Sequence, residues 1–135
     1  MKKIFAIVLP LILIAGLASW LIMGKETKQP ANLVGEWADA SGSMEATIQG
    51  DVIDIYWINS DDGSKALYWS GTYVAPTDAT EPYTWESQRD EEKTSSALLA
   101  STQPTKTFSY SGGVLSYEAS ALGISRTFEL KLKNQ

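Results

Sequence analysis

The side chains that most often carry out chemistry in proteins are scarce in this chain of 135 residues. It contains no histidine and no cysteine, so it lacks the usual general acid–base group and the thiolate nucleophile. A zinc site built from histidine and cysteine is excluded within one chain for the same reason. The sequence holds neither a Gly-x-Ser-x-Gly nucleophile elbow nor a phosphate-binding P-loop. The common hydrolase and nucleotide-binding classes are therefore poor matches.

Carboxylates are the remaining candidates for catalysis or metal binding. Asp61 and Asp62 lie in one predicted turn, and an acidic run occupies residues 90–92. Paired acids hydrolyse glycosidic bonds in many enzymes, and together with Asp39 and nearby carbonyl groups they would suit calcium. Aspartate and glycine are also frequent turn residues, and charged loop tips keep strand edges apart. We favour this structural interpretation and predict a non-enzymatic protein without a metal or another cofactor.

The elements that would position any site begin after a long apolar segment. Residues 4–24, IFAIVLPLILIAGLASWLIMG, carry no charge, and about 20 apolar residues suffice to span a bilayer as a helix. A cleaved signal peptide is the alternative, with Gly16-Leu17-Ala18 as its small-x-small site. Because the apolar run continues to Met23 and no such site follows it, we expect an uncleaved anchor.

Lysine residues before the segment indicate its orientation. Lys2 and Lys3 favour a cytoplasmic N-terminus, which would place the rest of the chain outside the cytoplasm at the cell membrane. Secretion after signal cleavage is the alternative. We therefore predict a signal-anchor transmembrane helix over residues 1–24, a linker over residues 25–33 and an extracytoplasmic domain over residues 34–135.

The domain is acidic, and this limits its partners. Past Gln29 the sequence has seven basic and fifteen acidic residues, which gives a net charge of −8. A surface of this sign argues against nucleic acid as a partner. We expect contact with the membrane through the N-terminal helix, and binding to an unknown protein or envelope component.

Alternating apolar and polar residues, separated by turn dipeptides, dominate the sequence after the linker. This pattern is typical of short antiparallel strands, and helical periodicity is hard to find. We count eight or nine strands, nearly all joined in sequence order, and predict an all-β domain that forms a small up-and-down barrel. A β-sandwich is the alternative.

Three glycine-containing turns set the registers of most strands. A two-residue loop at residues 50–51 places Met44 opposite Trp57, so this face of the hairpin is apolar. The turns at residues 112–113 and 122–123 direct a consistent set of side chains inward: Phe108, Tyr110, Leu115, Tyr117, Phe128, Leu130 and Leu132.

A fourth turn, at residues 62–63, decides where the aromatic rings of the third and fourth strands point. A two-residue loop would pair Trp57 with Tyr68 on the core side and Tyr56 with Trp69 on the outer side. A longer loop would shift the register and exchange the two rings of the fourth strand.

The two-residue version leaves several large side chains on the outer face: Tyr56, Ile58, Leu67, Trp69 and Tyr73. A continuous exposed apolar patch marks a contact site for a partner or a membrane. We therefore take Tyr56, Trp69 and Tyr73 as candidate partner-binding residues. The alternative is that residues 75–82 or residues 94–101 fold over them.

Gly35-Glu36-Trp37 opens the first strand, and Arg126 lies inward on the last strand opposite Ala119. These two features resemble the lipocalin-like (calycin) β-barrels. The resemblance implies that Trp37 plugs one end of the barrel and that the guanidinium group of Arg126 stacks on its indole. Gly35, Trp37 and Arg126 would then close the barrel. The resemblance also implies a cup for a ligand, and a small apolar-ligand carrier is the alternative function.

The C-terminal half contains SALLAS at residues 96–101, TKTFSY at residues 105–110 and LSYEASALG at residues 115–123. These segments resemble those of small uncharacterised exported proteins of Gram-positive bacteria and their prophages, and the resemblance implies no particular activity. We expect a membrane-anchored, extracytoplasmic β-barrel module that binds an unknown partner and catalyses no reaction.

Overall fold

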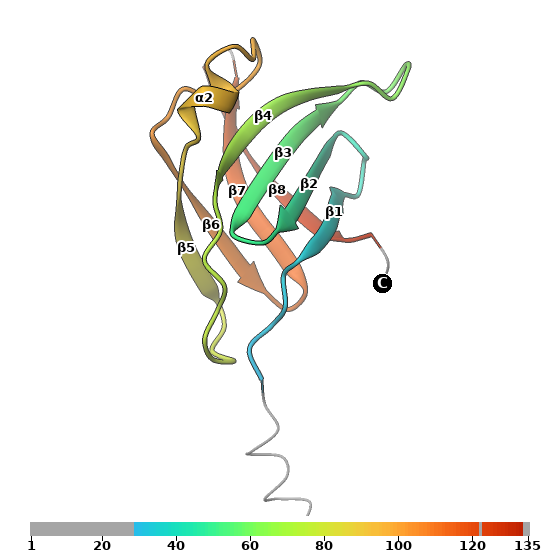
Figure 1. Ribbon diagram of the computed structural model, residues 1–135. Coiled ribbons are helices and arrows are strands. Elements are labelled where there is room, and N and C mark those ends of the chain that lie inside the picture. Colours follow the sequence, from blue (N-terminus) through green and yellow to red (C-terminus); the bar gives the residue numbers. More distant parts are fainter. Residues whose placement is uncertain (1–28, 122, 134–135) are drawn as a thin grey trace, which may run out of the picture. The chain divides into compact units, whose positions relative to one another are not determined.

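A computed structural model describes residues 29–121 and 123–133 of the chain (Figure 1). The expected transmembrane helix over residues 1–24 and residues 25–28 of the expected linker lie outside these residues. Within the described part of the chain, no helix is long and apolar enough to cross a membrane. The described strands all belong to one compact unit, Ala31–Gln135.

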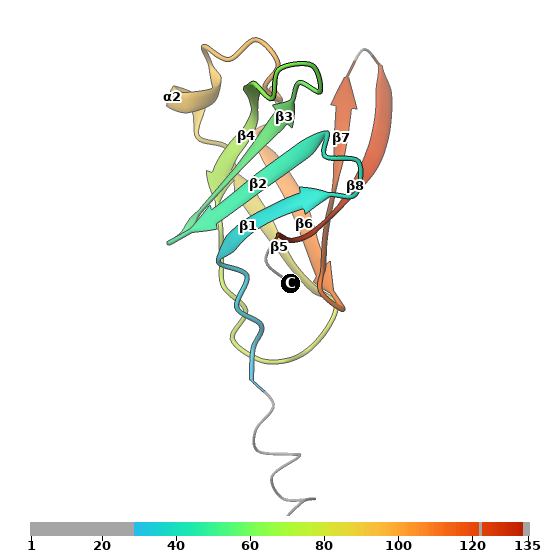
Figure 2. The same ribbon diagram turned by 90° about the vertical axis from the view of Figure 1, so that its right-hand side faces the viewer.

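The compact unit is built from eight strands and one short helix, α2 (Glu91–Thr94). The strands are β1 (Gly35–Asp39), β2 (Met44–Gln49), β3 (Val52–Ile58), β4 (Lys65–Thr72), β5 (Tyr83–Gln88), β6 (Thr105–Ser111), β7 (Val114–Ala121) and β8 (Ile124–Leu132). Their order in the sheet is β4-β3-β2-β1-β8-β7-β6-β5, and every pairing is antiparallel (Figures 1 and 2). The all-β class and the nearly closed barrel are confirmed.

The interior of the barrel is filled by the inward-facing side chains of both halves of the sheet. The largest fully buried side chains are Trp37, Trp69, Tyr68, Phe108, Leu33, Met44, Ile48, Ile53, Ile55, Leu115 and Leu130. Aromatic rings run through this core in successive contacts. Trp85 stacks on Phe108 at 4.9 Å between ring centroids, Phe108 meets Tyr117 at 5.5 Å, and Tyr117 stacks on Phe128 at 5.9 Å. Such packing contributes beyond the burial of apolar area.

Glycine turns fix the registers as the sequence predicts. Met44 pairs with Trp57 across the turn at residues 50–51, and Ile48 pairs with Ile53. Across the turn at residues 112–113, Tyr110 pairs with Leu115. The predicted β7–β8 register is also confirmed, with Tyr117 opposite Phe128, Leu115 opposite Leu130 and Ala119 opposite Arg126; Leu122 itself lies outside the described residues.

The predicted β3–β4 register is wrong. Residues 59–64 form a wider loop, because the backbone N–H of Asn59 bonds to the carbonyl of Ser64 and the backbone N–H of Gly63 bonds to the carbonyl of Asn59, both at 2.8 Å. Side-chain oxygens of Asn59 and Asp62 accept further backbone bonds within the loop. The ladder then shifts between Ile55 and Tyr56, and this bulge leaves Tyr68 without a partner on β3.

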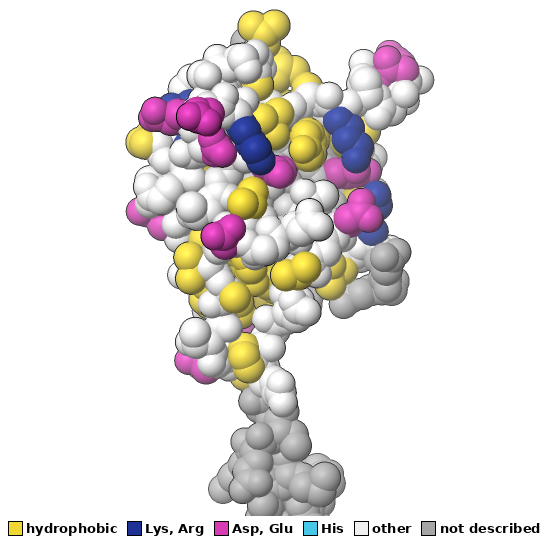
Figure 3. Space-filling model, viewed as in Figure 1, with side chains coloured by type: hydrophobic (Ala, Val, Ile, Leu, Met, Phe, Trp, Pro, Cys, Tyr) yellow, Lys and Arg dark blue, Asp and Glu magenta, His cyan; other side chains and the backbone are white. Residues whose placement is uncertain are grey.

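The region between β4 and β6 contains one predicted strand and one unpredicted helix. Residues 83–88 form β5, as expected. The expected tight turn at residues 89–93 instead contains α2, whose N-cap Asp90 accepts a bond from the backbone N–H of Lys93. Acidic side chains gather over this helix (Figure 3).

Candidate functional site

The candidate partner-binding aromatics do not form an exposed patch. Trp69 is fully buried and Tyr73 is 5% exposed, so their predicted exposure is wrong. Tyr56 is half-buried, with the ammonium group of Lys65 5.8 Å from its ring centroid. Over β3 and β4, Figure 3 shows hydrophobic side chains interspersed with polar and charged ones.

Trp57 lies on the core side beside the buried Tyr68, as predicted. It packs against Tyr68 and Phe128 on the inner side, at 5.2 and 6.0 Å between ring centroids. It is nevertheless only partly buried, and its indole N–H donates to the carbonyl of Leu99 at 3.1 Å. The loop that follows α2 thus contacts Trp57, which lies on the inner face.

The shifted β3–β4 register turns Trp69 to the inner face, where it pairs with the buried Ile55, and Tyr73 lies on the same face beside the seam where β4 and β5 meet. The indole N–H of Trp69 donates to the hydroxyl of Ser87 at 3.1 Å, and that of Trp85 donates to the carbonyl of Thr72 at 3.0 Å. Tyr73 meets Trp85 edge to face at 5.1 Å. The longer loop is the alternative that the sequence left open, and it turns Trp69 inward as that alternative required, although Tyr68 also stays buried at the bulge.

Gly71 allows this close approach of β5. A Cβ atom there would lie 2.4 Å from Ser87 Oγ, 2.6 Å from the Gln88 carbonyl and 2.7 Å from Trp69 Nε1. Within the described chain, one isolated bridge, Gly71 with Arg89, links the two strand edges. In place of a full ladder, the seam is closed by side-chain hydrogen bonds, by ring contacts and by a backbone bond from the Asp90 N–H to the Ser70 carbonyl at 2.7 Å.

The predicted barrel closure by Arg126 over Trp37 is wrong. Trp37 is fully buried, but its indole N–H donates to the carbonyl of Leu33 at 2.9 Å, and its partner on β8 is Leu132. Arg126 lies six positions earlier on β8, which is roughly 20 Å along a strand. Its exposed guanidinium group lies 5.0 Å from the ring centroid of Phe128. Gly35 remains beside Leu132 at the β1–β8 junction.

A lysine that the sequence interpretation missed points into the barrel wall. Lys106 is only 6% exposed and lies on β6 between two exposed or half-exposed threonines, Thr105 and Thr107. The register that turns Phe108 and Tyr110 inward also turns Lys106 inward. This alternation is the signal that could have identified it.

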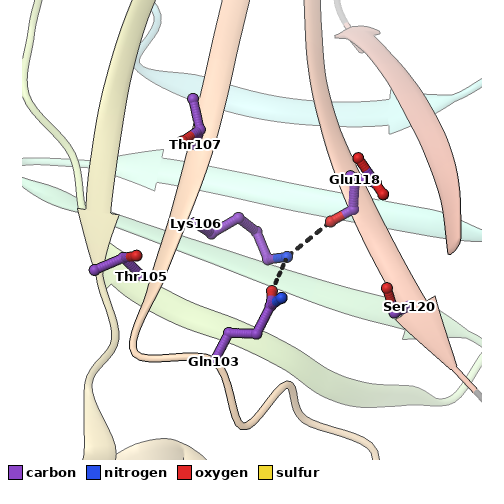
Figure 4. Close-up of a pocket in the computed structure, with 6 residues that line it drawn as sticks. All are labelled: Gln103, Thr105, Lys106, Thr107, Glu118 and Ser120. Carbon is purple, nitrogen blue, oxygen red and sulfur yellow. Dashed lines mark hydrogen bonds between the residues drawn. The ribbon is translucent and has the colours of Figure 1, made fainter.

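The buried lysine lies where β6 and β7 diverge. The two strands pair from Ser109 opposite Ser116 to Ser111 opposite Val114, next to the turn, and the described ladder ends there. In the gap beyond, the Lys106 ammonium group donates to the backbone carbonyl of Glu118 at 2.7 Å and to the side-chain carbonyl of Gln103 at 3.3 Å (Figure 4). Lys106 therefore joins two strands that no longer pair.

The gap forms a polar cleft of about 330 Å³. Its walls are Gln103, Thr105, Lys106, Thr107, Glu118 and Ser120 (Figure 4). Behind the ammonium group lie the rings of Tyr68 and Trp69, with centroids 5.1 and 5.4 Å away. Burial lowers the pKa of Lys106 to about 8, although the negative charge of Glu118 acts in the opposite direction.

These groups offer a cation, hydroxyls, an amide and a carboxylate to a ligand in one concave site. Among the described residues, no group of three or more acidic side chains is placed to hold a metal ion.

Comparison with family models, with curated proteins and with solved structures finds no match. The arrangement of this cleft is therefore the main guide to function.

Proposed function

We propose that the protein is a membrane-anchored, extracytoplasmic β-barrel module that binds a polar protein or envelope component in the Lys106 cleft and catalyses no reaction. The observation that carries this proposal is the buried ammonium group of Lys106 in the wall of an open polar cleft. A buried charge is costly unless it is paired, so a position of this kind is often functional.

The membrane anchor in this proposal rests on the sequence. The uncharged run over residues 4–24 is long enough to span a bilayer, and the lysines before it favour a cytoplasmic N-terminus. The acidic domain would then face the envelope. Its net charge of −8 past residue 29 is consistent with a soluble domain that does not lie on anionic lipid.

An apolar-ligand carrier with a lipocalin-like barrel is less well supported. Sites for small apolar ligands are cavities of roughly 300–1,000 Å³ lined mainly by apolar side chains. Here the barrel interior is occupied by buried rings such as Trp37, Tyr68 and Phe108. The cleft at Lys106 is on the wall of the barrel and its lining is polar.

Amine labelling tests the proposed site in the presence of its natural partner. We expect a small amine reagent to modify Lys106 several-fold less in native membranes than in the purified full-length protein, because the ligand occupies the cleft. Lys131, which is exposed on β8, is the internal control and should react equally in both preparations. Equal labelling ratios for the two lysines would contradict the proposal.

A further inference from the structure

The Lys106 cleft is bordered by two strand segments that each have one unpaired edge. Residues 105–108 of β6 pair with β5 on one side, and residues 117–121 of β7 pair with β8 on the other. Within the described part of the chain, neither segment has a ladder partner on the side that faces the cleft. Backbone N–H and C=O groups along such edges are ready to pair with another strand.

The Lys106 side chain spans the gap between these edges. Figure 4 shows it directed from β6 toward β7, where its ammonium group reaches the Glu118 carbonyl at 2.7 Å. The two segments therefore lie farther apart than hydrogen-bonded neighbours, whose spacing is about 4.8 Å.

We propose that an extended peptide segment of the partner binds in this cleft as an added strand between β6 and β7, with one of its carboxylate groups on Lys106. This inference rests on the proposed function and names its ligand class. Main-chain hydrogen bonds to the two free edges would supply affinity, as in other cases of strand addition.

The carboxylate follows from the present partners of Lys106. Its ammonium group donates to two neutral carbonyl oxygens, those of Glu118 and Gln103. A carboxylate forms a shorter and stronger charge-assisted bond with an ammonium group than a neutral carbonyl does. The peptide would also pair with the Glu118 carbonyl through its own backbone, and so release Lys106 from that bond.

The remaining lining suits an extended backbone. Thr105 and Thr107 project from one edge, and Ser120 lies on the other. Threonine is favoured in strands, and short hydroxyl side chains leave the backbone edges accessible. A glycan is the competing occupant of such a polar cleft, but it would use the hydroxyl groups and leave the backbone edges unpaired.

Peptide binding and amide exchange test strand addition. The probe is a library of free heptapeptides with alternating threonine and valine and one acidic residue at each position in turn, applied to the full-length protein in detergent micelles. We expect at least one peptide to slow hydrogen exchange of the backbone amides in both residues 105–108 and residues 117–121. N-methylation of all the peptide amides should abolish this protection, since it removes the donors toward both edges and blocks their close approach.

Substitutions of Lys106 test the carboxylate. Lys106→Met should weaken binding of the acidic peptide roughly 10- to 100-fold, the range expected for a lost charge-assisted bond, whereas Lys106→Arg should retain most of it. Protection of only one strand edge, or binding that is indifferent to N-methylation, would overturn the proposal. If Lys106 is shielded from the amine reagent in native membranes but no peptide slows exchange at both strand edges, the proposed binding function stands and strand addition is refuted. If Lys106 is not shielded and no peptide slows exchange at both edges, the proposed function and strand addition are both refuted.

Discussion

The ammonium group of Lys106 donates a 2.7 Å hydrogen bond to the backbone carbonyl of Glu118 across the place where β6 and β7 separate. One side chain thus stands where backbone pairs would otherwise lie. The contact explains how a long hydrophilic side chain is tolerated at 6% exposure in the wall of the barrel.

The first prediction concerns pH. Burial holds the pKa of Lys106 at about 8, below its ordinary value of 10.5. Between these values the unfolded chain retains a proton that the folded protein has released, so the free energy of unfolding should rise by about 1 kcal/mol from about pH 8 to about pH 9. Above that range the trend should reverse, because burial raises the pKa of Tyr68 and of Tyr117 and their ionisation favours the unfolded chain.

Urea unfolding of the full-length protein in detergent, at intervals from about pH 7 to about pH 10, measures this dependence. Lys106→Met has a side chain of similar length and no titratable group, so its profile should be flat between pH 8 and pH 9. A wild-type profile that is equally flat would show that Lys106 does not titrate in this range.

The second prediction compares two tryptophans. Trp69→Ala should lower the free energy of unfolding by about 3–5 kcal/mol, as large-to-small core changes do, and it also removes the bond to Ser87. Trp57→Ala should cost less, about 2–3 kcal/mol, because Trp57 is only partly buried. Chemical denaturation of both variants measures the order. The reverse order would favour the two-residue loop at residues 62–63.

The third prediction tests the β4–β5 seam. In Gly71→Ala the new methyl group would displace β5, so the backbone amides of Gln88 and Asp90, which bond to Thr72 and Ser70, should exchange faster. Gly42→Ala is the control.

Gly42 has a φ of 75°, and a Cβ atom at this position would have no neighbour within 4 Å. Its substitution strains only a surface turn, at a cost of about 1–2 kcal/mol. If the two variants change exchange at Gln88 and Asp90 equally, the seam is not held by the close packing at Gly71.

The fourth prediction separates Arg126 from Trp37. Arg126→Ala should change the free energy of unfolding by less than about 1 kcal/mol, because the guanidinium group is exposed where it lies over the Phe128 ring. Trp37→Phe should cost more, since it removes the buried bond to the Leu33 carbonyl as well as ring volume. Thermal unfolding of the two variants checks this order. A large loss in Arg126→Ala would restore closure of the lipocalin type.

The fifth prediction concerns the anchor, which lies outside the described residues. N-terminal sequencing of protein extracted from membranes should find Met1 or its neighbour, because the uncharged run over residues 4–24 lacks a good cleavage site at its end. A mature chain that begins near Ser19 would instead indicate a secreted protein.

Local turn chemistry explains which parts of the fold were predictable. Two-residue glycine loops fix the register of both strands they join, so the pairs Met44 with Trp57 and Tyr117 with Phe128 follow from the sequence. The β3–β4 hairpin also has a short turn signal, but Asn59 widens its loop and Tyr68 adds a bulge. Neither feature has a distinct sequence pattern.

Long-range contacts account for the other errors. Strands β1 and β8 are about 90 residues apart in the sequence, so no turn fixes their register. In the structure Trp37 pairs with Leu132, and Arg126 lies near Phe128. The inward direction of Lys106 follows from alternation along β6. The divergence of β6 from β7 does not, because a hairpin turn sets the start of a ladder and tertiary packing sets its end.

The central claim, that a ligand occupies the Lys106 cleft, is tested most directly by site-specific photo-crosslinking in native membranes. A photoreactive residue at Ser120, in the wall of the cleft, should capture one discrete partner, and the additional change Gln103→Ala should reduce the yield. The same residue at Lys131, exposed further along β8, should capture little. Equal capture from Ser120 and Lys131, unaffected by Gln103→Ala, would contradict the account.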